Sequence, residues 1–295
     1  MKIAVIEYRR SPPPTAQELM SAIQAKGHTP LYLKAHMLDA KITSRGVEVY
    51  HGVELVDVDA GLLRNIGLYL SLDTFLKRMG VVEALASRIP VVNNPASIIV
   101  TRDKWRCLLK LYLSGLPVPE TLVTENPFSA MRFTREKGRV VYKPIIGSLG
   151  LGSTLINDPD ISFHITRSLK NLGLPSYYQV FLEKPGYDYR VFVVGDTVIG
   201  AMKRVSSSWK TNIAQGAGGV KVTEEEEPEP FKIALKATKH LGLDYAGVDV
   251  AYDLGTEKYY LLEVNAFPNW EGLRRATGVN PPDAIVEHVI MKVRK

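Results

Sequence analysis

The side chains best suited to metal chemistry are Asp249, Glu263 and Asn265, which interrupt two apolar, strand-like runs at 246–252 and 258–265. Side chains alternate along a strand, so Glu263 and Asn265 point to one face about 7 Å apart. We expect the two runs to pair, which brings Asp249 to them. Clustered carboxylates repel unless a cation lies between them, and oxygen-only ligands suit Mg²⁺ that also binds phosphates. The alternative is two acids on an exposed sheet face, which their apolar neighbours disfavour.

A second candidate is the run VVYKPIIGSLGLGS, in which Lys143 ends an apolar strand and a glycine-rich loop follows at 147–152. A buried ammonium group is costly unless it meets an anion. Glycine-loop amides can approach phosphate oxygens closely. The order differs from a Walker A loop, because the lysine precedes the glycines. The run therefore predicts a phosphate site, with a flexible hairpin turn as the alternative.

Other polar residues are ambiguous when each is taken alone. Lys104 lies in an amphipathic helical pattern and by itself indicates a solvated lysine. Asp188 and Arg190 share one strand face, where they form either a salt bridge or a ligand contact. Arg204 and Asn212, in the run MKRVSSSWKTNIAQG, allow the same two interpretations.

The start of the chain predicts a strand at 2–6, a helix at 15–27 and a strand at 29–34. Thr15 and Glu18 have the spacing of a capping box for that helix. A β–α–β start of this kind favours a parallel sheet. No Gly-x-Gly-x-x-Gly follows the first strand, so the sequence does not support a Rossmann dinucleotide site.

The rest of the chain alternates helical and strand patterns after a break at Asn-Asn-Pro, 93–95. An acidic run at 224–230 indicates a solvated loop, and Gly195-Asp196 is expected to turn a hairpin. The expected helices cover 97–115, 162–173, 230–242 and 281–294, and the expected strands cover 118–124, 138–143, 153–156, 177–183, 187–194, 197–206, 246–252 and 258–265.

Composition limits the function. The chain has 295 residues and a net charge of +6, which favours anionic ligands and allows two or three subdomains. The basic residues are scattered without an RNA-binding aromatic motif, so nucleic acid is not expected as a partner. No apolar run is long enough to span a membrane, and Cys107, the one cysteine, suits the reducing cytoplasm where we expect the protein. The six histidines lack zinc-type spacing.

Taken in order, the segments resemble the ATP-grasp superfamily, and within it the RimK-type glutamate ligases, over about residues 90–280. The motifs are DKW, VVYKPIIGSLGLGS, GYDYRVFVVGDTVIGAMKR, WKTNIAQGA, YAGVDVAY and LLEVNAFPNWEGLRRATGVN. RVSSSWKTNIAQGA and EVNAFPNWEGL carry a closer similarity to the archaeal tetrahydromethanopterin:α-L-glutamate ligases.

The resemblance implies a mixed α/β and α+β fold of the ATP-grasp type. Its parts would be an N-terminal α/β domain at 1–95, a central lid domain at 96–182 and a C-terminal domain at 183–295, with ATP between the last two. The implied ATP-binding residues are Lys104, Lys143, Gly147, Ser148, Gly150, Gly152, Gln179, Val180, Phe181, Leu182, Asp188, Lys210, Thr211 and Asn212.

By the same resemblance Asp249, Glu263 and Asn265 hold two Mg²⁺ (or Mn²⁺) ions, and Arg190 and Arg204 are catalytic, facing the reacting phosphoryl and carboxylate groups. Two departures stand out in the nucleotide segments. Val180 replaces a glutamate that many relatives carry at the adenine-binding connection. Lys210-Thr211-Asn212 replaces the Arg-Ser-Asn of the ribosomal-protein-modifying branch, which loses bidentate geometry.

The implied activity is ATP-dependent ligation of L-glutamate to a small anionic carboxylate acceptor through an acylphosphate. A tetrahydromethanopterin-like cofactor is the first expectation. The alternatives are a carrier or ribosomal protein C-terminus, a deazaflavin cofactor, or a nucleotide-binding module without catalysis. The resemblance also allows a homo-oligomer. The turn at 266–275 either lines the amino-acid or acceptor site or is structural, with Trp270 packing against a neighbour.

Overall fold

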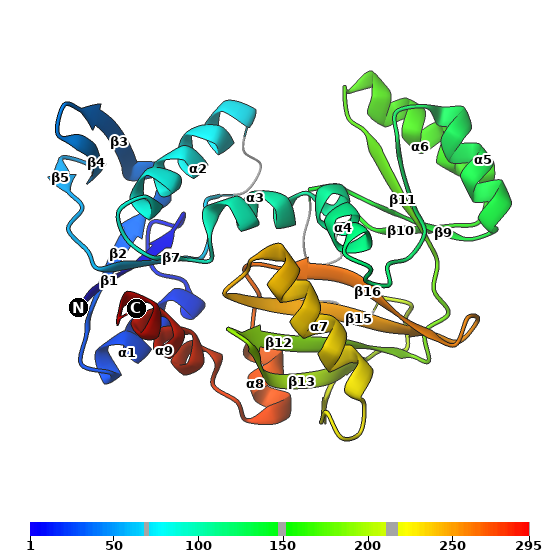
Figure 1. Ribbon diagram of the computed structural model, residues 1–295. Helices are drawn as coiled ribbons and strands as arrows, with labels where there is room; N and C mark the ends of the chain where they lie inside the picture. The colour runs from blue at the N-terminus through cyan, green and yellow to red at the C-terminus, as the bar shows by residue number, and fades with distance from the viewer. Residues whose placement is uncertain (68–70, 147–151, 211–217, 295) are drawn as a thin grey trace.

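Three larger sheets follow one another along the described chain, and helices pack against each of them (Figure 1); a fourth, smaller sheet lies beside the first. We name the three larger sheets the N-terminal, central and C-terminal sheets. The structure is a computed structural model that describes residues 1–67, 71–146, 152–210 and 218–294. No helix within those ranges has both the length and the apolar character needed to cross a bilayer.

The N-terminal sheet is parallel, as the β–α–β pattern predicts. Helices connect β1 to β2 and β6 to β7, as parallel pairs require a long crossover. Five of the six residues of the first strand are buried. In sheet order the strands are β2 (Thr29–Lys34), β1 (Lys2–Glu7), β6 (Ala60–Leu63) and β7 (Val91–Val92), and the main helices are α1 (Pro14–Ala25) and α2 (Leu72–Ala86).

A small antiparallel sheet beside α2 was not predicted, because each of its strands has at most one buried residue and so carries only a weak apolar pattern. It follows a short 3₁₀ turn, η1 (Ala35–Met37). The three strands are β3 (Leu38–Thr43), β4 (Gly46–His51) and β5 (Glu54–Leu55).

The predicted capping box on α1 is wrong. The helix begins one residue earlier than Thr15, with Pro14 in its first turn, and no side chain caps it. Proline is favoured there because its missing amide proton has no partner to lose. The carboxylate of Glu18 instead accepts hydrogen bonds from the far end of the chain, at Trp270 and Arg274.

The single helix predicted at 97–115 is two helices, α3 (Pro95–Arg102) and α4 (Lys104–Leu113). Asp103 between them has extended backbone angles, φ −95° and ψ 108°. Its carboxylate caps α4 by accepting hydrogen bonds from the amides two and three residues further on, at 2.9 and 3.1 Å. Lys104 therefore lies in the first turn of a new helix.

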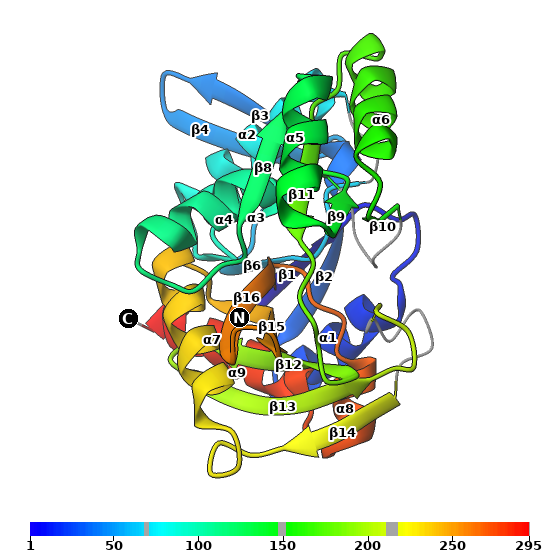
Figure 2. The same ribbon diagram turned by 90° about the vertical axis from the view of Figure 1, so that its right-hand side faces the viewer.

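The central sheet is antiparallel, and two helices pack side by side against it (Figure 2). A small apolar core that includes Phe133 and Tyr178 joins the two layers. The strands in sheet order are β10 (Thr154–Ile156), β9 (Val140–Lys143), β11 (Ser176–Val180) and β8 (Thr121–Thr124), and the helices are α5 (Pro127–Lys137) and α6 (Pro159–Asn171).

The C-terminal sheet has helices on both faces, because alternate residues of its strands enter different cores. Val191 packs in the core that holds α7, whereas Phe192 packs with Trp270. The strands in sheet order are β14 (Gly218–Val222), β13 (Thr197–Val205), β12 (Tyr187–Val194), β15 (Tyr245–Asp253) and β16 (Lys258–Asn265). The helices are α7 (Pro228–Leu241), α8 (Glu271–Thr277) and α9 (Pro281–Arg294).

Two expectations about this sheet have different outcomes. The hairpin turn at Gly195-Asp196 between β12 and β13 is confirmed, and Gly195 has φ +58° there. The loop predicted at 224–230 is shorter than expected, since α7 already begins at Pro228. Proline is favoured in a first helical turn, which explains the early start.

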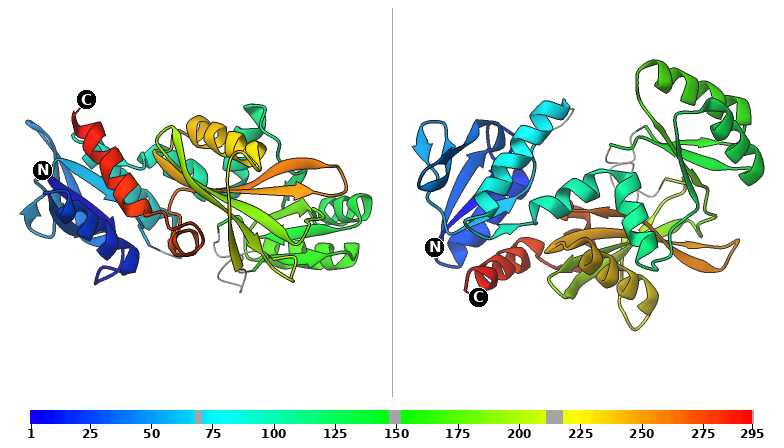
Figure 3. Two further views of the ribbon diagram at one scale, coloured as in Figure 1. Left: turned by 90° about the horizontal axis from the view of Figure 1, so that it is seen from below. Right: turned by 45° about the horizontal axis from the view of Figure 1, so that its top comes forward.

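The last helix returns to the first. Helix α9 lies against α1 (Figure 3), so the end of the chain completes the core on one face of the N-terminal sheet. Asn93, which follows β7 and is fully buried, joins the N-terminal and C-terminal sheets. Its amide nitrogen donates to the carbonyls of Tyr245 and Ala266 at 2.9 and 2.8 Å, and its oxygen accepts the amides of Asp244 and Tyr245.

Candidate active site

The predicted pairing of the two acid-bearing strands is confirmed. Asp249 on β15 lies directly opposite Glu263 on β16, and Gly247 lies opposite Asn265, so the three oxygen-bearing side chains share one face. The register shifts just after Asp249, where a β-bulge places an extra residue on β16. Bulges of this kind redirect side chains next to functional sites.

Arg190 and Arg204 reach these acids from the neighbouring strands. Arg190 on β12 lies opposite Asp249 on β15, and its Nε is 2.8 Å from Asp249 Oδ1. Arg204 stands opposite Asp188 and holds its carboxylate through two hydrogen bonds of 2.7 and 2.8 Å. Its Nη2 is also 3.2 Å from Asp249 Oδ2. Ion pairs thus link four buried side chains across three strands.

Burial sets the protonation behaviour of this network. Burial raises the pKa of Asp249, since it disfavours the charged carboxylate more than Arg190 and Arg204 favour it. Burial also lowers the pKa of Arg190. Burial also disfavours the charged form of Arg204, but the carboxylates of Asp188 and Asp249 outweigh that effect and raise the pKa of Arg204. The network is therefore a strained group of charges in a place with little solvent.

Lysines approach the same centre from the helices and the central sheet. Lys104 Nζ is 3.7 Å from Glu263 Oε1. Lys143 donates a hydrogen bond to the side chain of Gln179 on the adjacent strand β11. Burial lowers the pKa of Lys143 to about 8, and Glu263 partly opposes that shift.

Lys184 is a further basic residue near this centre, and it was not among the residues predicted from the sequence. Its Nζ lies 4.0 Å from Asp188 Oδ2, and burial lowers the pKa of its ammonium group. The sequence does hold a signal for this contact. Lys184 precedes Asp188 by four residues, and a turn at Gly186 between them lets the lysine reach the acid. Lys184 therefore belongs to the same group of charges as Lys143 and Asp188.

The centre carries more positive than negative charge. Five basic side chains and three acidic ones influence one another there, which leaves two positive charges unbalanced. Burying such an excess is costly unless an anion joins it. The members are Lys104, Lys143, Lys184, Arg190, Arg204, Asp188, Asp249 and Glu263.

The segment predicted to hold adenine links the central sheet to β12. The amides of Val180 and Phe181 already donate to the carbonyls of Glu120 and Arg139, at 2.9 and 3.1 Å. The Leu182 amide has no hydrogen-bond partner among the described residues, so it is the backbone donor left for a ligand. The segment from 179 to 182 therefore offers a base one open amide rather than several.

The chain after β13 folds back onto this segment. The Trp209 ring packs edge-on against Phe181, with the ring centroids 6.4 Å apart. Lys210 Nζ lies 5.2 Å from the centre of the Trp209 ring. The structure thus brings Lys210 to the predicted adenine segment.

The glycine loop is described only at its end. Gly152 has φ +76°, and a Cβ there would lie 2.9 Å from the Pro144 ring. Glycine is therefore favoured at this position, next to the residue that follows Lys143. The other predicted loop and phosphate residues, Gly147, Ser148, Gly150, Thr211 and Asn212, lie outside the described residues.

The turn after β16 is structural at Trp270, which is 1% exposed. Its indole Nε1 donates to Glu18 Oε2 at 2.6 Å, and the Arg64 guanidinium stacks on the ring at 4.5 Å. Trp270 therefore packs between the N-terminal and C-terminal sheets, as the alternative interpretation of the turn predicts.

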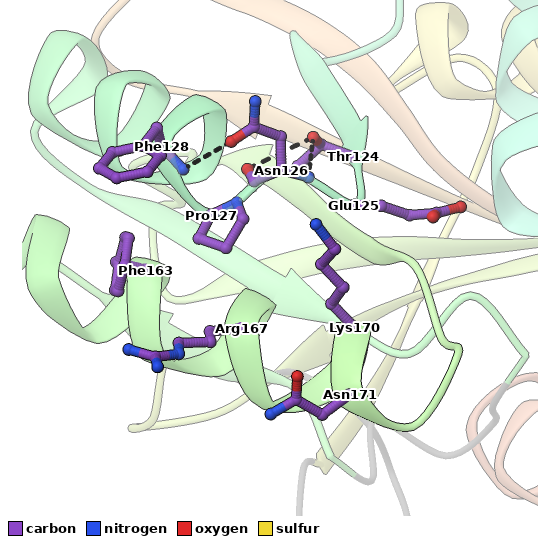
Figure 4. A pocket seen from close by; sticks show the side chains of 9 residues that line it. All are labelled: Thr124, Glu125, Asn126, Pro127, Phe128, Phe163, Arg167, Lys170 and Asn171. Atoms are coloured by element: carbon purple, nitrogen blue, oxygen red, sulfur yellow. Dashed lines mark hydrogen bonds between the residues drawn. The ribbon is translucent and has the colours of Figure 1, made fainter.

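A hollow of about 760 Å³ lies elsewhere, between the end of β8 with the start of α5 on one side and α6 on the other (Figure 4). Asn126 caps α5 there by accepting the Phe128 amide at 2.9 Å. Arg167 and Lys170 line the α6 side. None of its lining residues belongs to the charged centre.

The donor set at the centre suits a divalent metal that shares its ligands with a second group. The described residues contain no cluster of three His, Cys, Asp or Glu side chains able to hold a metal by themselves. Asp249, Glu263 and Asn265 together supply oxygen donors only, and Oδ1 of Asp249 is buried and lies 2.8 Å from Arg190 Nε without making a hydrogen bond of regular geometry in the described chain. Such a set fits Mg²⁺, which commonly completes its shell with phosphate oxygens and water.

Comparison with known proteins gives one consistent result. Residues 101–289 match the RimK-like ATP-grasp domain. The chain is 34% identical to a tetrahydromethanopterin:α-L-glutamate ligase of Methanocaldococcus jannaschii over 83% of this chain and 84% of that protein. It is 30% identical to a probable α-L-glutamate ligase of Stenotrophomonas maltophilia over the full length of both.

The fold is that of a solved ATP-grasp ligase. The ATP-grasp ligase PsnB, solved with a minimal precursor, Mg and ADP, superimposes with a TM-score of 0.75 at 22% identity, over 99% of this chain and 98% of that one.

Proposed function

This chain belongs to the RimK-like ATP-grasp family of ligases, and we propose that it joins L-glutamate to a carboxylate acceptor at the expense of ATP. The observation that carries the proposal is the buried charged centre. Its positive excess suits the phosphates of ATP, and its oxygen donors suit the metal that accompanies them. We also propose three domains, at 1–95, 96–182 and 183–295. The buried charged centre would then lie between the second and the third domain.

The chemistry has two steps. An oxygen of the acceptor carboxylate attacks the γ-phosphorus of ATP, and ADP leaves, which gives an acylphosphate. The amine of glutamate then attacks the acyl carbon, inorganic phosphate leaves and the amine loses a proton, which gives the amide. The enzyme must therefore bring two anions together and keep water from the acylphosphate.

The residues around the centre can meet the first demand. Lys143 and Lys184 would bind phosphate oxygens of ATP, with Lys104 beside them. Asp249, Glu263 and Asn265 would hold two Mg²⁺ or Mn²⁺ ions, which when bound neutralise charge on the β- and γ-phosphates.

Arg190 is placed to bind the transferring group. Its Nη1 is buried and has no hydrogen-bond partner in the described part of the chain, although its Nε pairs with Asp249. Gly247 beneath it leaves the room that this side chain occupies. We propose that Nη1 donates to the oxyanion that develops during transfer, while Arg204 holds Asp188 and Asp249 in position.

The acceptor we propose is a small anionic cofactor of the tetrahydromethanopterin type, because archaeal relatives named for that substrate align over most of the chain. A different carboxylate acceptor is the second candidate, since the relative that spans the full chain is named for glutamate ligation alone. Incubation with labelled glutamate and a panel of acceptors, followed by mass analysis of the product, decides between them.

The activity itself is tested by ADP release that depends on both glutamate and acceptor. Glu263→Ala should abolish it and leave the fold intact by circular dichroism. Glu136→Ala, which removes an exposed acid of α5, is the matched control and should keep wild-type turnover. Near-wild-type turnover of Glu263→Ala would overturn the metal site. ATP binding without turnover across the whole panel would show a nucleotide-binding module instead.

A further inference from the structure

The carboxyl edge of the N-terminal sheet faces the candidate active site. Arg64 follows β6 directly and donates to the Tyr245 hydroxyl and to the Pro268 carbonyl, both at 3.1 Å. Asn93 follows β7 and donates to the Ala266 carbonyl. Ala266 and Pro268 come immediately after Asn265, so this edge abuts the end of the strand that carries Glu263.

The topology makes the end of β1 the natural binding position on that edge. The next strand in the chain, β2, pairs on one side of β1, and β6 pairs on the other, so the chain leaves in opposite directions. In open α/β sheets such a switch point leaves a crevice outside the carboxyl ends of the strands, where ligands bind.

Three exposed residues follow β1 at this point: Tyr8, Arg9 and Arg10. The two arginine side chains have no acidic partner among the described residues. The nearest acid in sequence, Glu7, is 4% exposed, and its carboxylate accepts the Tyr8 amide at 3.0 Å. The Arg9 carbonyl accepts a hydrogen bond from the Tyr32 hydroxyl at 2.7 Å, which fixes the backbone but not the guanidinium.

Further basic groups extend this surface toward the active site. The Tyr8 ring contacts two basic side chains. Its centroid lies 6.0 Å from the centroid of the His36 ring and 5.2 Å from the Arg78 guanidinium. Arg102 donates to the Gly67 carbonyl at 3.1 Å, in the segment that follows Arg64. It lies two residues before Lys104, whose ammonium is at Glu263. We call the group Arg9, Arg10, His36, Arg78 and Arg102 the basic edge.

We propose that the basic edge binds a second anionic group of the acceptor, a phosphate or a carboxylate distinct from the carboxylate that reacts. The inference rests on the proposed ligase function and adds a requirement on its substrate. In the proposed reaction the basic side chains of the charged centre, Arg190 and Lys143 among them, match the charge of the reacting carboxylate. The exposed guanidinium groups of Arg9 and Arg10 have the fork geometry that binds phosphate or carboxylate through two parallel hydrogen bonds.

The test compares two variants that remove equal charge. Arg9→Gln/Arg10→Gln removes the two exposed arginines of the basic edge. Arg132→Gln/Arg135→Gln removes two exposed arginines of α5, which likewise have no ion pair among the described residues, and serves as the control. The first variant should raise the KM for the acceptor about tenfold, the size of one good charge-assisted contact, with kcat and the KM values for ATP and glutamate unchanged. The control should match the wild type.

A binding experiment tests the same idea without turnover. Calorimetric titrations use enzyme saturated with Mg-ADP and a series of ω-phosphonocarboxylic acids of increasing length, with the monocarboxylic acids of equal length alongside. The wild type and the control should bind one phosphonocarboxylate at least tenfold more tightly than its monocarboxylate counterpart, and Arg9→Gln/Arg10→Gln should lose that preference.

The outcomes separate the two proposals. A wild-type enzyme without preference for the second anion, or an Arg9→Gln/Arg10→Gln variant that keeps it, overturns the role of the basic edge. An equal loss in both variants also overturns it, because the effect is then one of overall charge. A preference that is lost only in the basic-edge variant, with no ligation of any acceptor, supports the anion site and refutes the ligase function.

Discussion

The carboxylate of Glu18 on the first helix accepts a hydrogen bond from the indole nitrogen of Trp270 at 2.6 Å, across 252 positions of sequence. The same carboxylate accepts two hydrogen bonds from Arg274, at 3.1 and 2.7 Å. One side chain of α1 thus holds the turn that follows Asn265. The N-terminal sheet is therefore coupled to the candidate active site through a polar contact as well as through apolar packing.

Glu18→Gln should destabilise the protein. The amide oxygen can still accept the indole proton, but the substitution removes the second acceptor oxygen and the negative charge that hold Arg274. Because both charged side chains are 36% exposed, the expected cost is about 0.5–1.5 kcal/mol in the free energy of unfolding. Urea denaturation measures the change. Glu83→Gln, which alters an exposed glutamate on α2, should leave the free energy of unfolding unchanged. Equal stability of the two variants would contradict the role of this contact.

The Glu18 contact also predicts a pH dependence of stability. Burial opposes ionisation, but hydrogen bonds from Arg274 and Trp270 outweigh it and lower the pKa of Glu18 below 4.5. A depressed pKa means that the contribution is complete above pH 4.5 and is lost as the pH falls through the lower folded value. The melting-temperature difference between wild type and Glu18→Gln should therefore shrink on acidification. A difference that stays constant below pH 4.5 would refute this sign.

Lys143 predicts a second pH effect, on nucleotide binding. Burial lowers the pKa of its ammonium group to about 8 in the free enzyme, and only the protonated form attracts phosphate. ATP affinity should therefore fall as the pH rises above about 8. In Lys143→Arg the charge persists, so the decline should move to higher pH, even if the absolute affinity changes. The same pH profile in both proteins would show that another group controls binding.

Gly247→Ala tests the space under Arg190. A Cβ there would lie 2.5 Å from Arg190 Nη1 and 2.8 Å from Pro268 Cβ, so one of them must move. We expect kcat to fall at least about tenfold and the free energy of unfolding to fall by about 1–3 kcal/mol. Gly80→Ala is the control, because no atom lies within 4 Å of a Cβ there and a helical alanine is favoured. Full activity of Gly247→Ala would exclude Arg190 from a positional role.

The local patterns predicted the elements around the site well, for reasons visible in the structure. The pairing of Asp249 with Glu263 follows from two apolar runs joined by a short turn, which leaves a hairpin as the simple arrangement. The turn at Gly195 follows in the same way, since its positive φ favours glycine. Where neighbours in sequence are also neighbours in space, period and turn chemistry decide the outcome.

The errors arose where distant residues compete for a side chain. Glu18 has the spacing of a capping residue, yet Trp270 and Arg274 bind it, and no local pattern reveals partners so far along the chain. The pattern at 97–115 predicts one helix with Asp103 inside it, whereas the Asp103 carboxylate caps α4 and separates it from α3. The partners of Arg190 and Arg204 depend on which strands pair with β12, and the sequence does not fix that pairing. The sequence therefore left open whether these arginines form salt bridges or contact a ligand.

The packing of α9 against α1 has a consequence for folding. Ile285, Val286 and Val289 on α9 share a core with Leu19 and Ile23 on α1, so residues far apart along the chain cover one face of the N-terminal sheet. Contacts of such large sequence separation carry a high loop-closure entropy and tend to form late. Until α9 docks, the apolar face of α1 lacks its partner, and the partly folded chain must keep that face from other contacts.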